Sequence, residues 1–429
     1  MIRFVDLFAG TGGIRLGFEQ ALSKIGIKTL CVKSIEIDKK ACETYESNFG
    51  ENPYGDITQE NQLPDFDVLL AGFPCQSFSY AGKQLGFGDT RGTLFFEVER
   101  LLEKHHPRLC LLENVRGLTT HDKGRTFKTI IERLEKLGYF VSYRLLNASN
   151  FGVPQNRVRI YIVASLDGDV KLSLLDDVGA ADSHKYKAKQ SNNLNLFETE
   201  NKYVAVENIL ENSVDEKYNC SEWFVSSLSN LLAGDLSKLH GKRLIDTRNG
   251  ESIHSWELGL KGQCSPEEQH FMNELLKNRR RSEFGTHQDG KALTIEQIKT
   301  FYKDKNIGKT MKSLLKKGYL KNKNEKFNPV CGNMSFEVFK FLDPKSISIT
   351  LTASDAQRLG VFHAGKVRRI TPRECARLQG YPDTYQLHPD DKFAYKQLGN
   401  AVSVPVIESL ILDYFKNNPN SQLLNISDN

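Results

Sequence analysis

Short apolar runs alternate with amphipathic segments through about the first 166 residues of the chain. The runs have little internal polar alternation, which is typical of strands buried on both faces of a sheet. The segments between them repeat apolar residues at helical spacing. The expected strands cover residues 4–8, 29–35, 67–71, 109–113, 140–146 and 158–163, the last two as a pair, and the expected helices cover 14–24, 39–49, 93–104 and 124–137. This order predicts an α/β fold with a mostly parallel sheet between layers of helices.

The pattern changes after about residue 166. Residues 167–202 are polar and irregular, as expected of a linker or a long surface loop. In the region that follows, two short helices before a strand pair would resemble a winged helix. The expected elements are helices at 293–302 and 308–320, a strand at 333–342, and C-terminal helices at 371–378 and 405–415.

Charge is unevenly distributed along the 429 residues. The whole chain has a formal net charge of +5, yet residues 277–326 hold 15 Lys and Arg against 5 Asp and Glu, so the remainder is net acidic. Such a segment is either a solvated face rich in lysine or a surface for a polyanion. Its position among the motifs described below favours the polyanion.

The eight cysteines show neither a C-x-x-C pair nor the spacing of zinc ligands. They are therefore expected to be reduced thiols, and no metal is expected. No stretch approaches the ~20 apolar residues that span a bilayer. A carboxylate at Asp6 is atypical of a secretory signal, so we expect a cytoplasmic protein with no membrane partner.

The run Asp6-Leu7-Phe8-Ala9-Gly10-Thr11-Gly12-Gly13 joins the first expected strand to the first helix. Glycines there would let a ligand approach the backbone beside a helix N-terminus. Glu36 ends the second strand, where a carboxylate can accept hydrogen bonds from ribose hydroxyls. A dinucleotide fingerprint would need glycine at position 15, but the sequence has Arg15, which favours an adenosine-type ligand without a pyrophosphate. By itself, such a turn is equally typical of plain chain geometry.

Three further motifs follow expected strands. Cys75 lies in Gly72-Phe73-Pro74-Cys75-Gln76-Ser77-Phe78-Ser79, a loop at the sheet's carboxyl edge, and is a candidate nucleophile, although a lone cysteine is more often a small buried hydrophobe. Glu113, in Glu113-Asn114-Val115, should lie near it by sheet topology; the alternative is a helix-capping acid. Arg157 and Arg159 alternate on one strand, where they either point into a site or line a solvated edge.

These motifs occur in order with two more, Arg369-Ile370-Thr371-Pro372-Arg373-Glu374-Cys375-Ala376-Arg377-Leu378-Gln379-Gly380-Tyr381-Pro382 and Gln397-Leu398-Gly399-Asn400-Ala401-Val402. Together they closely resemble the DNA (cytosine-5) methyltransferases, most of all the bacterial restriction-modification enzymes. The resemblance covers about residues 3–166 and 366–415. It implies a Rossmann-like methyltransferase core with a mixed sheet, and a smaller inserted target-recognition domain.

The resemblance implies S-adenosylmethionine as cofactor and S-adenosylhomocysteine as product. Glu36 would bind the ribose and Asp56 the adenine amino group. Many members have an aromatic residue after the motif glutamate, whereas this chain has Ile37, so adenine stacking there is weaker or differently supplied. The matching cofactor positions are Phe8, Gly10, Thr11, Gly12, Gly13, Glu36, Ile37, Asp56, Ile57, Gly72, Pro74, Leu94 and Asn400.

The resemblance also implies the chemistry. The Cys75 thiolate would add to C6 of a cytosine flipped out of duplex DNA, Glu113 would hold N3 and the exocyclic amine, and Arg159, with Arg157 beside it, would bind the base carbonyl. The core would comprise residues 1–166 and 393–429, the recognition domain 167–365, and a hinge motif 366–392. Residues expected to contact DNA are Gln76, Ser77 and Ser79, in a loop that closes over the base, and Arg279, Arg280, Arg281, Lys309, Lys312 and Lys316.

The expected partners are double-stranded DNA and a cognate restriction endonuclease. One active unit per chain suffices, so we expect a monomer. Three alternatives remain at this stage: an RNA cytosine-5 methyltransferase of the same fold, a non-catalytic DNA-binding regulator, and a nicotinamide-dependent oxidoreductase. Arg15 and the Cys75/Glu113 pair argue against the last, and intact motifs argue against the second.

Overall fold

The computed structural model describes residues 1–74, 94–176, 205–247, 252–285, 291–330 and 336–425. The chain divides into two compact units. The first comprises Met1–Leu210, Lys345–Ala356 and Pro372–Asn429, and the second comprises Glu211–Pro344 and Gln357–Thr371. The first unit is thus built from both ends of the chain, and it extends to Leu210 where the sequence suggests a boundary near residue 166.

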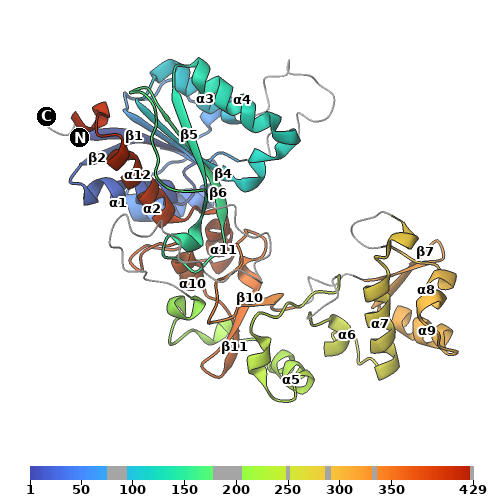
Figure 1. The fold of residues 1–429 in the computed structure, drawn as a ribbon. Coiled ribbons are helices and arrows are strands. Elements are labelled where there is room, and N and C mark those ends of the chain that lie inside the picture. Colours follow the sequence, from blue (N-terminus) through green and yellow to red (C-terminus); the bar gives the residue numbers. More distant parts are fainter. Residues whose placement is uncertain (75–93, 177–204, 248–251, 286–290, 331–335, 426–429) are drawn as a thin grey trace. The chain divides into compact units, whose positions relative to one another are not determined.

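The first unit alternates strands and helices along most of its length (Figure 1). Its elements are β1 Ile2–Leu7, α1 Gly13–Lys24, β2 Thr29–Ile35, α2 Lys39–Phe49, β3 Val68–Ala71, α3 Leu94–His105, β4 Leu109–Val115, α4 Arg125–Lys136, β5 Phe140–Asn147, β6 Val158–Ser165, α10 Pro372–Leu378, α11 Asp391–Asn400, α12 Val404–Asn417 and α13 Gln422–Asn425.

The central sheet has the strand order β2-β1-β3-β4-β6-β5. Neighbours from β2 to β4 are parallel, whereas β6 runs antiparallel to both β4 and β5. The carboxyl ends of β1, β2, β3 and β4 therefore share one edge, where ligands of open α/β sheets bind. The expected α/β core with a mixed sheet is confirmed.

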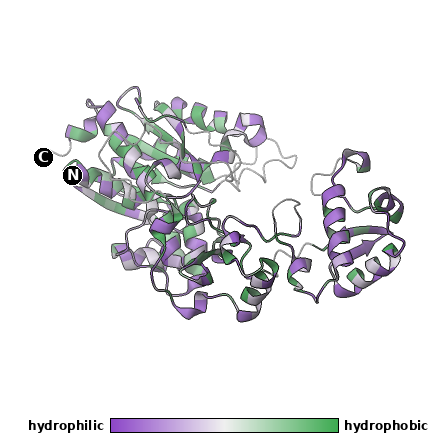
Figure 2. Ribbon diagram, turned by 60° about the horizontal axis from the view of Figure 1, so that its bottom comes forward, coloured by the Kyte–Doolittle hydropathy of each residue, from purple (hydrophilic) through white to green (hydrophobic). Residues whose placement is uncertain are grey.

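Side chains on alternate strand positions fill two separate cores. Val68 and Leu70 of β3 point into one cluster with α1 and α12, while Leu69 and Ala71 point into the other with α3 and α4. This alternation is the two-residue period of a strand. Both helical layers bury apolar faces. Figure 2 colours the hydrophobic residues of the ribbon green.

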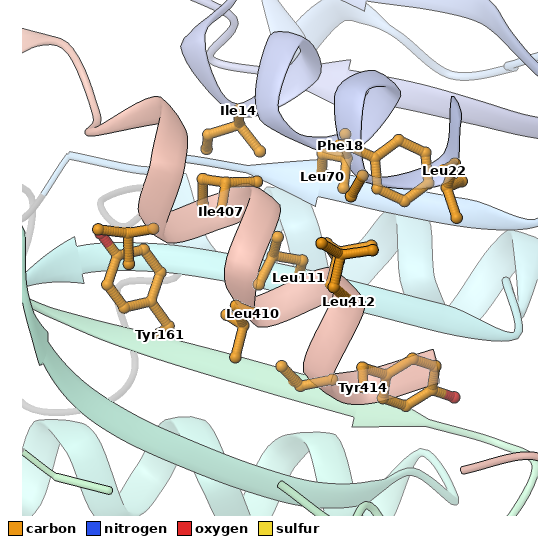
Figure 3. Packing of buried hydrophobic residues seen from close by; sticks show 14 of the residues in the cluster. Ile14, Phe18, Leu22, Leu70, Leu111, Tyr161, Ile407, Leu410, Leu412 and Tyr414 are labelled. Carbon is orange, nitrogen blue, oxygen red and sulfur yellow. The ribbon is translucent and has the colours of Figure 1, made fainter. Parts of the chain in front are cut away.

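Helix α12 returns the C-terminal part of the chain to the face of the sheet that α1 covers. Figure 3 shows Ile14 and Phe18 of α1, Ile407 and Leu412 of α12, and Leu70 of the sheet in one packed cluster. The helices approach closely because Gly17 lies at their contact: a Cβ there would come within 2.7 Å of the Ile407 Cβ. The N-terminal strands therefore lack one wall of their core until α12 packs.

The stretch Asp391–Asn417, which spans α11 and α12, is long and apolar enough to cross a membrane by length and composition, contrary to the expectation from the sequence. However, 78% of its most apolar window is buried inside the protein. Burial of this kind is typical of a core helix, and α12 is such a helix.

The second unit holds the remaining elements: α5 Glu222–Leu231, α6 Ser255–Leu258, α7 Pro266–Asn278, α8 Ile295–Phe301, α9 Ile307–Lys317, β7 Leu320–Lys323, β8 Lys326–Pro329, β9 Lys340–Phe341, β10 Leu359–His363 and β11 Lys366–Arg369. Its strands form a three-stranded sheet, β11-β10-β9, and a hairpin, β7-β8. One apolar cluster lies around α5 and the three-stranded sheet, and another within α7, α8, α9 and the hairpin.

The expected strand at 333–342 is wrong for most of its length. Residues 333–335 lie outside the described residues, and of the remainder only Lys340–Phe341 pairs, in parallel with β10. The strand pair that follows the two short helices is instead the hairpin β7–β8, which begins directly after α9. Most of the polar stretch 167–202 also lies outside the described residues.

Candidate active site

The Gly-rich turn after β1 consists largely of residues with left-handed backbone. Phe8, Gly10 and Gly12 have φ values of 54°, 55° and 73°, and α1 begins at Gly13. A positive φ is costly for a phenylalanine, so the surrounding structure must impose it. Hydrogen bonds from Ala9 N to the Ile35 oxygen (3.0 Å) and from Gly12 N to the Ala9 oxygen (2.7 Å) hold the turn beside β2.

The glycines of this turn serve different purposes. A Cβ on Gly12 would lie 2.3 Å from the Phe49 ring, and a Cβ on Gly13 would lie 2.5 Å from the Tyr381 Oη, so both glycines are required by packing. A Cβ on Gly10 would meet nothing closer than 3.9 Å. Of these three predicted cofactor-binding positions, Gly10 alone leaves open space beside the turn, as a bound ligand needs.

The Glu36 carboxylate is fixed next to that open position. One oxygen accepts a hydrogen bond from Gly10 N (2.8 Å) and the other from Asp38 N (2.7 Å). Ile37, the next residue, exposes 64% of its surface. The end of β2 therefore presents a carboxylate with free lone pairs beside an uncovered apolar side chain, which suits the ribose and base of a nucleoside.

Other predicted cofactor positions lie in varied surroundings. Asp56 caps the short turn that follows it, accepting hydrogen bonds from the Thr58 backbone and hydroxyl at 3.0 and 2.8 Å. The Ile57 side chain is 4% exposed and belongs to the apolar core, and its contact with a cofactor stays a prediction. Leu94 begins α3 and packs on the same core, whereas Pro74 and Asn400 are exposed.

Glu113 and Arg159 form an ion pair at the carboxyl end of β4. The antiparallel register sets Val115 opposite Arg159, and the Arg159 Nε lies 3.3 Å from the Glu113 Oε1. Each side chain is only 14% exposed. Burial raises the pKa of Glu113 from its usual 4.5, although the charges of Arg159 and Arg157 oppose the shift. The site thus holds a carboxyl group with a raised pKa beside a fixed cation.

The loop that would carry the nucleophile starts beside this pair. A Cβ built on Gly72 would lie 3.7 Å from the Glu113 Oε2, three residues before Cys75. The Asn114 side chain donates a 2.8 Å hydrogen bond to the Phe73 oxygen and so fixes the start of the loop. Cys75, Gln76, Ser77 and Ser79 themselves lie outside the described residues.

Arg157 does not point into the open site with Arg159, and this expectation is corrected. Its side chain is 2% exposed, and its guanidinium donates to the carbonyl oxygens of Leu351 (2.9 Å) and Ala401 (2.6 Å), with longer bonds to Gly399. Burial, followed by the charge of Arg159, lowers the pKa of Arg157 to about 9, which leaves it charged at neutral pH. Arg157 holds three distant chain segments together and is a positioning residue.

Two tyrosines that the sequence interpretation left without a role brace the Gly-rich turn. Tyr385 Oη donates to the Thr11 carbonyl oxygen, and Tyr381 Oη shares a 3.0 Å hydrogen bond with the Thr11 hydroxyl. Both follow α10: Tyr381 lies in the motif that ends at Tyr381-Pro382, and Tyr385 lies three residues beyond its end. The only signal in the sequence was the presence of that motif, because the partners are about 370 residues apart.

The residues predicted to contact DNA also include both buried and exposed side chains. Arg279 is 1% exposed, and its guanidinium bonds the Asn328 side chain, so it ties α7 to β8 and its expected role on the DNA-binding surface is corrected. Arg280 donates to the Thr247 oxygen (3.1 Å), and Arg281 pairs with Glu283 at 3.7 Å. By contrast, the three predicted lysines of α9, Lys309, Lys312 and Lys316, are exposed.

No group of three or more His, Cys, Asp or Glu side chains that could hold a metal ion occurs among the described residues. The cysteines within the described ranges are free thiols, and burial raises the pKa of Cys31, Cys42 and Cys220 to about 12 in each case. Those three thiols therefore stay protonated at neutral pH and are poor nucleophiles.

A mostly parallel sheet, a Gly-rich turn with a nucleoside-type carboxylate beside it, and a buried Glu–Arg pair at the same edge define a Rossmann-like transferase of the methyltransferase class. A model of the C-5 cytosine-specific DNA methylase family matches residues 2–416. The chain belongs to this family and is a DNA (cytosine-5) methyltransferase, as the motifs predict.

Several relatives match over nearly the whole chain. The Type II methyltransferase M.BanI of Aneurinibacillus aneurinilyticus is 64% identical over 98% of this chain and 97% of its own length. M.HgiCI of Herpetosiphon aurantiacus is 61% identical over 97% of this chain and 98% of its own. Among solved structures, the methyltransferase EhMeth of Entamoeba histolytica covers 97% of this chain and 98% of its own with a TM-score of 0.50 and 18% identity, a likeness of fold.

Proposed function

We propose that this enzyme transfers a methyl group from S-adenosylmethionine to C5 of a cytosine that has been flipped out of duplex DNA, with Cys75 as covalent nucleophile. The observation that carries the proposal is the Glu113–Arg159 pair, whose Glu113 Oε2 would lie 3.7 Å from a Cβ built on Gly72, at the start of the Cys75 loop. A buried carboxyl and a guanidinium side by side match the N3, amine and carbonyl edge of cytosine.

The residues around the Gly-rich turn fit the cofactor. The open space at Gly10, the immobilised Glu36 carboxylate and the uncovered Ile37 would receive an adenosine group, with Glu36 accepting from the ribose hydroxyls. When bound, S-adenosylmethionine supplies an electrophilic methyl group on its sulfonium. The chain's part is to hold that group still, which Tyr381 and Tyr385 assist by fixing Thr11.

C5 of cytosine is a poor nucleophile within an aromatic ring. Addition of the Cys75 thiolate to C6 breaks the aromaticity and places electron density on C5. A protonated Glu113 donates to N3 as charge develops there, and its raised pKa supports this role. After methylation, loss of the C5 proton to a base expels the Cys75 sulfur and restores the ring. The target cytosine must first leave the base stack of the duplex, at a cost of a few kcal/mol.

The relatives M.BanI and M.HgiCI bear the name Type II methyltransferase, at 64% and 61% identity. We therefore propose that this enzyme protects DNA from a cognate restriction endonuclease that cuts the same site. The substrate is duplex DNA in the cytoplasm, and one chain holds the Glu113–Arg159 pair and the Gly-rich turn, so a monomer suffices.

The decisive experiment compares Cys75→Ser with the wild type. Genomic DNA from a host without cytosine methylation is incubated with tritiated S-adenosylmethionine, and methylated cytosines are then mapped by sequencing. Wild type should label DNA at one short sequence. The methylation rate of Cys75→Ser should be lower by a factor of about 10³ or more. Cys264→Ser, a partly exposed thiol of the second unit, is the matched control and should retain full activity.

Undiminished methylation by Cys75→Ser would exclude the assigned nucleophile. Transfer to tRNA in preference to DNA by the wild type would instead favour the RNA enzyme. A purified wild type that retains its fold but labels neither nucleic acid would refute the proposed activity.

A further inference from the structure

Residues 265–285 and 291–330 of the second unit follow the element order of a winged helix. Helix α7 comes first, then a short extended segment at Leu293, then α8, α9 and the hairpin β7–β8. Leu293 and Phe327 exchange backbone hydrogen bonds of 2.9 and 2.7 Å, which adds a third strand position to the hairpin. A helix-turn-helix followed by such a hairpin is a DNA-binding arrangement in which the second helix of the pair enters a groove.

The segment has a hydrophobic core of its own. The cluster contains Met272 and Leu275 of α7, Ile298 of α8, and Met311 and Leu314 of α9, all at most 3% exposed. All cluster members lie between residues 256 and 327. The surface of α9 opposite this core is therefore left free by the segment's own packing.

Local signals fix the geometry of the segment. Ser265 with Glu268 and Thr294 with Gln297 form capping boxes at the starts of α7 and α8. Asn324 and Glu325 have φ values of 52° and 59°, as a two-residue type I′ hairpin turn requires. An ion pair of 2.6 Å between Lys317 and Glu268 joins α9 to α7.

The free surface of α9 is uniformly basic. Lys309, Lys312 and Lys316 lie at three- and four-residue spacing and are exposed on the side opposite Met311 and Leu314. The hairpin continues the charge with exposed Lys321, Lys323 and Lys326, and between residues 299 and 326 the acids are limited to Asp304 and Glu325.

An ordinary solvated helix face would look different. Helix α4, a surface helix of the first unit, intersperses Glu132 and Glu135 with its cations, and its Lys128 lies 3.5 Å from Glu132. Helix α9 contains four lysines and no acid. Of these lysines, Lys317 pairs with Glu268, and the other three form no ion pair with any described residue. Repulsion within such a face is relieved by a polyanion rather than by water alone.

We infer that residues 265–285 and 291–330 form a winged-helix unit that binds duplex DNA, with α9 in the major groove and the β7–β8 hairpin against flanking phosphates. A helix of about 10–12 Å diameter fits a groove about 12 Å wide. Lys309 and Lys312, near the start of α9, are placed to reach base edges, and Lys316 and the hairpin lysines contact phosphates. This inference rests on the proposed function, because it assigns the surface through which that enzyme holds its substrate.

The test uses the full-length chain and a random-sequence 40-base-pair duplex, so no knowledge of the target site is needed. Anisotropy titrations at several salt concentrations compare wild type with a triple variant, Lys309→Ala, Lys312→Ala and Lys316→Ala. The matched control replaces three exposed lysines of the first unit, Lys104, Lys128 and Lys136, by Ala. Circular dichroism checks that all three proteins are folded.

On the random-sequence duplex, where binding is non-specific, all three lysines would contact phosphates. The α9 variant should therefore bind at least ~10-fold more weakly at 0.1 M salt, and the slope of log affinity against log salt should become shallower by about 2–3, near 0.9 per lost phosphate contact. The control should bind as the wild type does. An unchanged slope in the folded α9 variant, an equal loss in the control, or preference of the wild type for single-stranded or RNA oligonucleotides would overturn the inference.

A methyl-transfer assay on the same proteins distinguishes a failure of this inference from a failure of the proposed function. Wild type that methylates DNA while the α9 variant keeps its slope would remove only the winged-helix role. Wild type that binds duplex DNA through α9 but transfers no methyl group would support the role of α9 as a DNA-binding surface and remove the proposed function.

Discussion

The two charged regions of this chain use charge in opposite ways. At the edge of the central sheet, Glu113 and Arg159 are each 14% exposed, and they lie 3.3 Å apart. On α9, Lys309, Lys312 and Lys316 are exposed and have no ion-pair partner among the described residues. The first region is a few buried groups of opposite sign, and the second is a surface of one sign.

The difference follows from dielectric screening. A buried pair interacts strongly and shifts pKa values, so it can stabilise charge that develops on a bound base. Exposed lysines interact weakly with any one phosphate and are screened within about 8–10 Å by salt, but many of them together supply affinity. Chemistry should therefore depend on pH, and DNA affinity on salt.

Glu113→Gln tests this comparison with the largest expected effect. Glutamine keeps the shape but cannot donate a carboxyl proton, so kcat should fall about 10²–10⁴-fold while DNA affinity and its salt dependence stay unchanged. The measurements are kcat on genomic DNA and anisotropy across salt. A variant with normal kcat, or one that loses DNA affinity instead, would break the division between the two regions.

The raised pKa of Glu113 also predicts the direction in which kcat and stability change with pH, and Glu113→Gln tests this prediction. Burial raises the pKa of Glu113 above 4.5, so its protonated form persists to higher pH, and the wild-type kcat should lose this contribution as pH rises through the folded-state pKa. The folded state should likewise lose stability as pH rises from about 4.5 through that pKa, because charging a buried carboxyl is costly. In Glu113→Gln both dependences should flatten, which denaturation and rate profiles over pH can check.

Arg157→Met tests whether Arg157 stabilises the fold rather than taking part in the reaction. Removing its guanidinium leaves the buried carbonyl group of Leu351 without this donor and the Ala401 carbonyl with a longer 3.4 Å hydrogen bond from the Gln379 side chain, so the free energy of unfolding should fall by about 3 kcal/mol. Urea denaturation measures this loss. Arg125→Met, at a side chain 72% exposed, serves as comparison and should stay within about 0.5 kcal/mol of wild type.

The smallest expected effect belongs to Tyr385→Phe. Loss of the hydroxyl that donates to the Thr11 oxygen should cost about 1 kcal/mol of stability and loosen the Gly-rich turn. The KM for S-adenosylmethionine should rise several-fold, with kcat on saturating cofactor and the affinity for DNA nearly unchanged. Should kcat fall without a change in KM, the turn would not be the element that Tyr385 positions.

The local pattern of apolar and polar residues predicted most strands and helices of the first unit. The strand expected at 109–113 is observed as Leu109–Val115, and the helix expected at 14–24 as Gly13–Lys24, because buried strands and amphipathic helices have distinct periods. The hairpin β7–β8 was missed although its signal was present: Asn324-Glu325 is a two-residue turn between short alternating runs.

The site was predictable in its residues but less so in its contacts. The position of Glu113 beside the start of the Cys75 loop follows from neighbouring parallel strands, as β3 and β4 are. The role of Arg157 does not follow, since its partners lie 194 to 244 residues away and no local pattern encodes them. The same holds for Arg279, whose burial depends on a contact with Asn328.

The packing of α12 against α1 has a consequence for biosynthesis. The ribosome completes β1 and α1 roughly 20–80 s before it releases α12, at the usual rate of about 5–20 residues per second. During that interval α1 covers only its own part of this apolar face of the nascent sheet, and the part that α12 will cover must be shielded by chaperones or by transient collapse. A prematurely terminated chain would keep that face open and be a substrate for proteolysis, so only a completely translated polypeptide yields a lasting methyltransferase.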